Sequence, residues 1–96
     1  MKMLIVVYSG STPSRISSLL DSHHAGGYTE FRNAHGLGRT GRRDGSRAWP
    51  GESTLFLSVV PAETSMELVH VLRNEGSRLG AGERIHVAVL PTETFF

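Results

Sequence analysis

Runs of apolar residues predict four strands in this 96-residue chain. Residues 3–8 (MLIVVY) and 53–60 (STLFLSVV) are rich in apolar, β-branched side chains, which is typical of central strands covered on both faces. Residues 84–90 (RIHVAVL) alternate between apolar and other side chains, as a strand with one buried face does. Residues 28–35 (YTEFRNAH) predict a further strand whose two faces are both mixed.

Two other segments carry apolar residues at helical spacing. The first helix follows the first strand, because Ser11 or Thr12 can cap it and Pro13 suits its first turn, and it ends near residue 24. The second covers residues 63–75, where T-x-x-E at 64–67 fits a capping box. The residues at helical spacing in the first helix are Ile16, Leu19, Leu20 and His23. The predicted buried stripe of the second helix contains Ala62, Met66, Val69 and Leu72.

The predicted order is therefore β-α-β-β-α-β. This order is the ferredoxin-like α+β fold, with a four-stranded antiparallel sheet and both helices on one face. A chain of this length forms one domain, residues 1–96. The face of the sheet without helices needs a partner sheet or a coat of charged side chains.

A long loop between the second and third strands is the most unusual segment. Residues 36–51 (GLGRTGRRDGSRAWPG) hold five glycines, four arginines and a single acid. Glycines let backbone N–H groups approach a ligand, and arginines bind phosphate or carboxylate through two hydrogen bonds. The loop is thus predicted to bind an anion or a partner protein.

Two nucleotide-binding motifs are excluded in this loop. Residues 36–41 match the dinucleotide-binding pattern G-x-G-x-x-G, but the sequence that follows, RRDGSRAWPG, cannot form the helix which that motif requires. A phosphate-binding loop of the Walker A type needs Lys-Ser/Thr where this chain has Arg42 and Arg43.

Composition excludes several classes of protein. A net charge of +1 argues against nucleic-acid binding, and no apolar run approaches the length of roughly 20 residues that membrane insertion needs. The absence of cysteine is compatible with the cytoplasm and removes thiolate chemistry. No catalytic arrangement of side chains is visible, so the chain is not expected to be an enzyme. The five histidines are scattered, and His35 and His86 form the best metal-binding pair only if their strands adjoin.

Two short motifs resemble those of the PII signal-transduction superfamily. Residues 36–39 (GLGR) are similar to the base of that family's T-loop, and residues 80–87 (GAGERIHV) resemble its B-loop motif G-x-G-(K/R)-I-x-V, with one extra residue before the basic position. The order of strands and helices also matches over nearly the whole chain. The chain thus resembles a single PII-like domain with a T-loop-like segment at about residues 36–52.

The resemblance implies a regulatory homotrimer whose three sheets pack around a central axis. It implies an adenine nucleotide (ATP, ADP, AMP or cyclic AMP) or another anion in the clefts between neighbouring subunits, and a T-loop that engages a transporter, an enzyme or a regulator. The nucleotide would lie against Gly36, Leu37, Gly38, Arg39, Gly82 and Arg84. The loop side chains that would bind the partner protein are Arg42, Arg43, Arg47 and Trp49.

Departures from the family pattern leave two alternatives open. The loop is shorter than a full T-loop, contains no tyrosine, and has Thr40 where the family usually has glutamine, which argues against a site for 2-oxoglutarate with Mg-ATP. The first alternative is a metal-binding trimer similar to the divalent-cation tolerance proteins, using His35 and His86. The second is an interaction module with an empty cleft, whose Arg/Trp loop binds an acidic partner.

Overall fold

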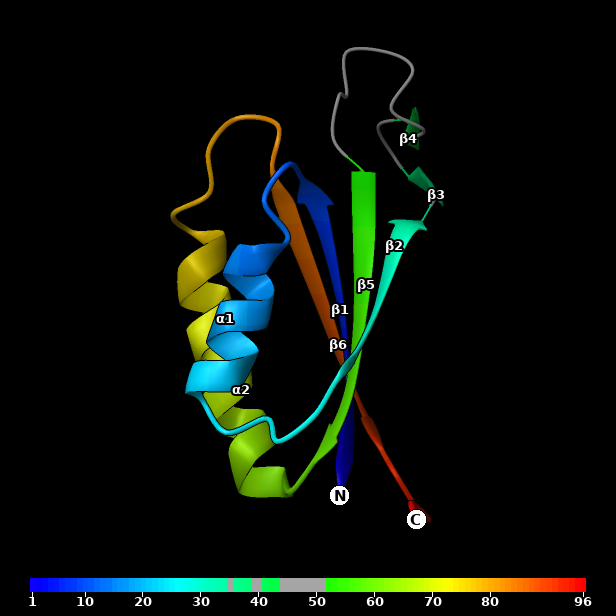
Figure 1. Ribbon diagram of the computed structural model, residues 1–96, viewed down its shortest axis with the longest axis vertical. Helices are drawn as coiled ribbons and strands as arrows, with labels where there is room; N and C mark the ends of the chain where they lie inside the picture. The colour runs from blue at the N-terminus through cyan, green and yellow to red at the C-terminus, as the bar shows by residue number, and fades with distance from the viewer. Residues whose placement is uncertain (35, 39–40, 44–51) are drawn as a thin grey trace.

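A computed structural model of the chain describes residues 1–34, 36–38, 41–43 and 52–96, with only the backbone described for residues 36–38, 41–43 and 52. Figure 1 shows the helices packed beside a twisted sheet. The elements in chain order are β1 (Lys2–Gly10), α1 (Ser14–Ser22), β2 (Thr29–Ala34), β3 (Gly36–Gly38), β4 (Gly41–Arg43), β5 (Glu52–Val60), α2 (Ala62–Gly76) and β6 (Arg84–Pro91).

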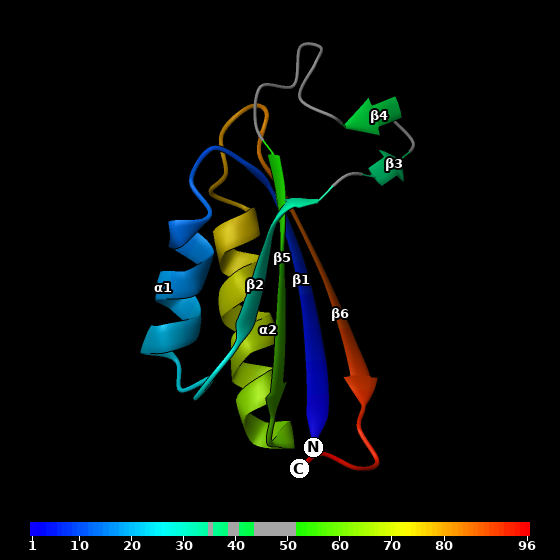
Figure 2. The ribbon, with the colours of Figure 1, turned by 45° about the vertical axis from the view of Figure 1, so that its right-hand side comes forward.

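The main sheet is antiparallel, with strand order β2-β5-β1-β6, and β3 and β4 form a separate two-stranded sheet. Both helices lie on the same side of the main sheet (Figure 2). The predicted ferredoxin-like α+β fold is confirmed. Within the described ranges, neither helix has the length and apolar character needed to cross a membrane.

The core lies between the helices and the even-numbered side chains of β1 and β5. Leu4, Val6 and Tyr8 of β1 and Phe56 of β5 are fully or almost fully buried. The ring of Tyr28 packs against Phe56 with ring centroids 5.9 Å apart. Each such apolar side chain contributes about 1.5–3 kcal/mol when it leaves water. The helices complete the core with Ile16, Leu20, Leu68 and Leu72.

The odd-numbered residues of the same strands form a second apolar face that no helix covers. Ile5 lies opposite Leu57, and Val7 lies opposite Leu55, in the register of β1 and β5. Phe31 of β2 lies opposite Leu55 and is 48% exposed. The continuous apolar pattern of the two central strands therefore reflects a sheet that is apolar on both sides and covered on only one.

The predicted buried stripe of α2 is partly wrong. The buried residues of this helix are Ser65, Leu68 and Leu72, whereas Ala62 is exposed and Met66 is 74% exposed. Val69 instead lines a groove of about 490 Å³ between α2 and β6. The apolar residues of α2 thus lie in the core, in this groove or on the surface, and the sequence pattern did not distinguish these positions.

Neither predicted side-chain helix cap forms. Pro13 and Pro61 occupy the N-cap positions of the two helices, and neither cap has a side-chain hydrogen bond. Glu67 accepts a hydrogen bond from His23 across 2.8 Å, so this carboxylate joins the two helices instead of capping one of them. His23, predicted within the first helix, is half-buried and follows the end of α1 at Ser22.

The alternation predicted for residues 28–35 is interrupted. The pairing of β2 with β5 changes register between Phe31 and Ala34, and Asn33 has a positive φ of 60°. Asparagine is one of the few residues that adopt this left-handed conformation readily. Side chains before and after this irregularity therefore do not follow one alternation.

We expect Leu68→Ala to lower the free energy of unfolding by about 2–5 kcal/mol, because it leaves a cavity in the core. Met66→Ala on the same helix should change it by less than about 0.5 kcal/mol, because this side chain is exposed. Urea denaturation followed by circular dichroism measures both values. Equal losses in the two variants would contradict the assignment of the core face of α2.

Candidate functional site

Three segments lie at the same end of the main sheet: the turn after β1, the loop before β6, and the β3–β4 hairpin (Figures 1 and 2). In the hairpin Gly36 pairs with Arg43, and Gly38 pairs with Gly41. The antiparallel pairing of β1 with β6 places Ser9 opposite Arg84 at this end. Residues from distant parts of the sequence are thus brought to one end of the sheet, with the hairpin on the side of β2 and the loop before β6 at the opposite edge.

The loop before β6 closes in a tight turn. The Glu83 N–H donates to the Gly80 carbonyl across 3.2 Å, and Gly82 has a φ of 86°, which favours glycine at the third position of such a turn. The backbone N–H groups of Ala81 and Gly82 have no hydrogen-bond partner within the described part of the chain. The turn therefore offers two unpaired backbone donors.

Arg84 adds a positive charge directly after this turn. Its side chain is exposed and has no ion-pair partner among residues 1–34 and 53–96. Backbone N–H groups together with a guanidinium are the donors that proteins use to bind phosphate and other anions. The turn and Arg84 together have the chemistry of an anion site.

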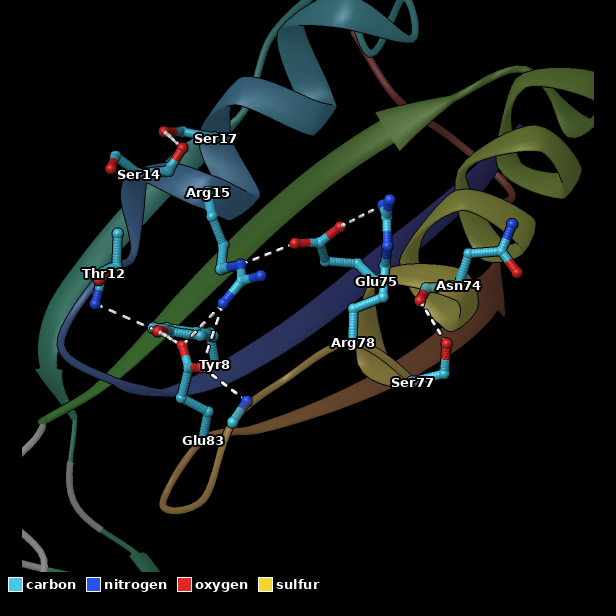
Figure 3. A network of polar contacts seen from close by, with 11 residues as sticks. Tyr8, Thr12, Ser14, Arg15, Ser17, Asn74, Glu75, Ser77, Arg78 and Glu83 are labelled. Carbon is cyan, nitrogen blue, oxygen red and sulfur yellow. Dashed lines mark hydrogen bonds and ion pairs between the residues drawn. The ribbon is translucent and has the colours of Figure 1, made fainter.

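A network centred on Glu83 holds the turn in place (Figure 3). The Tyr8 hydroxyl donates to Glu83 Oε2 across 2.5 Å, and the Gly80 N–H donates to Oε1 across 3.0 Å. The Arg15 guanidinium donates to the same carboxylate at 3.0 and 3.1 Å. One carboxylate thus joins the turn to β1 and to α1.

Arg15 extends the network to the second helix. Its Nε donates to Glu75 Oε2 across 2.7 Å, while one of its terminal nitrogens faces Glu83. Arg78 lies 3.8 Å from the other oxygen of Glu75. Both helices and the loop before β6 are therefore connected through a single guanidinium.

The Tyr8 hydroxyl also organises the turn after β1. It accepts a hydrogen bond from the Thr12 N–H at 3.1 Å while its ring is fully buried. Gly10 lies between these two residues with a φ of 154°, and a Cβ at this position would come within 2.5 Å of the Tyr8 hydroxyl oxygen. Gly10 is therefore the residue that leaves room for the Tyr8 hydroxyl.

The network fixes the protonation states of its members. The hydrogen bond from Tyr8, and next the one from the Gly80 N–H, hold the pKa of Glu83 below its ordinary value of 4.5. Burial, followed by the bond to Glu83, raises the pKa of the Tyr8 hydroxyl. Near neutral pH the pair is thus a carboxylate accepting from a phenol.

The structure brings together only some of the residues that the sequence predicted. Gly82 lies in the turn before β6 and Arg84 begins this strand, at the same end of the main sheet as β3 with Gly36, Leu37 and Gly38. The backbone of Arg42 and Arg43 forms β4. Outside the described residues lie His35, Arg39, Arg47 and Trp49.

The expectation of a histidine pair is not supported within one chain. His86 is on β6, while β2, the strand that leads toward His35, lies at the opposite edge of the sheet with β5 and β1 between. The condition that the two strands adjoin is therefore not met. The described residues also contain no group of three or more His, Asp or Glu side chains that could hold a metal ion.

Sequence reasoning missed the Glu83 network. Tyr8 and Glu83 are 75 positions apart, and Arg15 and Glu75 are 60 positions apart, so no local motif connects them. The one available signal was the extra residue in the GAGERIHV segment, which is Glu83 itself if the basic position is Arg84. The negative charge of an acid inserted beside an anion-binding motif would repel the anion, so a cationic partner for this acid is expected elsewhere in the fold.

The fold is similar to those of solved PII-like proteins. CPII, a nitrogen regulatory PII-like protein from Thiomonas intermedia K12 solved with ADP, AMP and bicarbonate, superposes with a TM-score of 0.65 at 22% identity, over 93% of this chain and 86% of that one. The apo form of CPII gives a TM-score of 0.64 at 18% identity, over 93% and 87% of the two chains. A protein from Thermus thermophilus described as a PII-like signaling protein gives 0.63 at 19% identity, over 93% and 84%.

No protein-family model matches the chain, and no curated protein matches it in sequence. The likeness to solved structures shows the fold, and the chain therefore has the fold of the PII-like proteins. The resemblance that the two motifs and the element order predicted is thus confirmed for the fold, at identities between 18% and 22%.

The lowered pKa of Glu83 predicts acid-sensitive stability. Because the folded-state pKa lies below the unfolded value of 4.5, the stabilisation is present above pH 4.5 and is lost as the pH falls through the folded-state pKa. Glu83→Gln should therefore flatten the dependence of the unfolding midpoint on pH below 4.5. Urea denaturation at a series of pH values measures this dependence.

The matched control is Glu93→Gln, which removes the same charge from an exposed carboxylate outside the network. This variant should keep the slope of the wild-type protein. An equally steep slope in Glu83→Gln would show that other groups cause the acid sensitivity.

Proposed function

We propose that this chain is a PII-like sensor that binds an adenine nucleotide or a related anion and does not act as an enzyme. The observation that carries the proposal is the turn from Gly80 to Glu83, which leaves the N–H groups of Ala81 and Gly82 unpaired beside the exposed Arg84. CPII, which shares the fold, was solved with ADP, AMP and bicarbonate, all of which carry anionic oxygens. The same ligand class suits the donors of this turn.

The proposed site is completed by the segment that enters the loop after β2. Gly36, Leu37 and Gly38 lie on β3 at the same end of the sheet as Gly82 and Arg84. Arg39, which follows β3 directly in the sequence, would supply a second guanidinium. In this proposal β3 approaches one side of the nucleotide, and Gly82 and Arg84 bind its phosphates.

We further propose that the protein is a homotrimer assembled through its open sheet face. Ile5, Val7, Leu55 and Leu57 give this face an apolar centre, and Phe31 adds an exposed ring. An exposed apolar surface of this kind is typical of an interface between subunits. Burial of three such faces against one another would remove them from water and would create the clefts between subunits that the nucleotide site needs.

Signalling is proposed to run through the arginine-rich loop between β2 and β5. Arg42, Arg43, Arg47 and Trp49 offer positive charge and one large aromatic side chain within eight positions. Arginine and tryptophan are enriched among the residues that carry most of the energy of protein interfaces. The partner, a transporter, an enzyme or a regulator, would therefore present an acidic surface to this loop.

Arg84→Gln should weaken the binding of ADP by roughly tenfold or more, because a charged hydrogen bond contributes about 1.5–3 kcal/mol. Isothermal titration calorimetry with ADP, AMP and bicarbonate measures the affinities. The matched control is Lys2→Gln, which removes one positive charge at the other end of β1 and should leave binding unchanged. Failure of the wild-type protein to bind any of these ligands would contradict the sensor function and favour the ligand-free interaction module.

Leu57→Glu should convert the trimer into monomers, because it places a charge at the centre of the open face opposite Ile5. Met66→Glu adds the same charge to an exposed position on the helical side and should leave the trimer intact. Size-exclusion chromatography with light scattering gives the mass of each variant. A monomeric wild-type protein would overturn the proposed assembly.

A further inference from the structure

We propose that Glu83 is a positioning residue, which holds the Gly80–Gly82 turn in the shape that receives the anionic ligand and joins this turn to the start of α1. The inference rests on the proposed function, because the ligand is the one assigned to this turn above. It adds a role for an acidic residue that lies inside an anion-binding segment. Acids in such a segment normally repel the ligand, so the position of Glu83 requires an explanation.

The directions of the Glu83 hydrogen bonds explain why an acid can lie in this segment. Both oxygens of the Glu83 carboxylate are directed into the protein, toward Tyr8 and Arg15, and one of them also accepts from the Gly80 N–H (Figure 3). The side chain is 19% exposed. Its charge is therefore balanced internally, while the N–H groups of Ala81 and Gly82 remain available to a ligand.

The charged and titratable groups around this carboxylate come from every element packed against it. They are Tyr8 on β1, Arg15 on α1, and Glu75 and Arg78 at the end of α2 and just beyond it. Arg15 is shared between two carboxylates, so the loss of one partner leaves it bound to the other. Removal of Glu83 should thus release the turn while the contact between the two helices persists.

The sign of the effect on binding separates positioning from simple charge. If Glu83 acted only through its negative charge, its removal would strengthen the binding of an anion at the adjacent turn. If it positions the turn, its removal weakens binding, because the ligand must then order a loop that the carboxylate had already fixed. Tyr8→Phe tests positioning with no change of charge, because it removes the hydroxyl that donates to Glu83, together with the bond that this hydroxyl accepts from the Thr12 N–H.

The first experiment uses the ligand-free protein. Amide hydrogen exchange measured by NMR should show a protected Gly80 N–H in the wild-type protein and exchange about tenfold faster in Glu83→Ala and Tyr8→Phe. Glu93→Ala, an acid removed elsewhere, should keep the wild-type rate. An unprotected Gly80 amide in the wild-type protein, or an unchanged rate in both network variants, overturns the inference.

The second experiment titrates ADP into the same four proteins. Glu83→Ala and Tyr8→Phe should bind about tenfold more weakly than the wild-type protein, and Glu93→Ala should bind equally well. Stronger or equal binding by Glu83→Ala would overturn the positioning role. The absence of ADP binding by the wild-type protein would contradict the proposed function instead, and the exchange rates would still decide whether Glu83 holds the turn.

Discussion

The two central strands are apolar on both faces, and the rest of the structure depends on how those faces are covered. The helices α1 and α2 cover one face, where Leu4, Val6 and Phe56 become fully buried. The other face keeps Ile5, Val7 and Leu57 only half-buried. A single chain therefore leaves one apolar face of its sheet without a covering layer, and this face is the basis of the proposed association of several chains.

The sequence predicted the strands and helices with long periodic patterns, but it predicted less well which of their faces are buried and where they begin and end. Residues 3–8 and 53–60 predicted strands that the structure extends by one or two residues at their ends, because the apolar runs dominate any local preference. In α2, however, Met66 and Leu68 are both apolar, and only contact with the sheet decides that Leu68 faces the core. The caps at Pro13 and Pro61 likewise depend on how the chain leaves each preceding strand, which local spacing does not reveal.

For the candidate site, the sequence offered candidates that lie close together in the chain, and it missed the residues of the Glu83 network that the fold brings together. The glycines and Arg84 belong to a local motif, so a resemblance could find them. Tyr8 and Arg15 contribute through contacts with Glu83 that span 68 to 75 positions and need the antiparallel pairing of β1 with β6. A polar network of this kind has no sequence period, and it becomes visible only when the strands are in register.

The close approach of Gly10 to Tyr8 restricts the order in which substitutions can accumulate. A chain can exchange the Tyr8 hydroxyl for hydrogen while it keeps Gly10, since no atom is added. It cannot gain a side chain at position 10 first, because the new Cβ would overlap both the hydroxyl oxygen and the adjoining ring carbon, at 2.5 and 2.8 Å. A smaller residue at position 8 would remove this overlap but would empty part of the core, and the φ of 154° at position 10 would still strain any residue other than glycine.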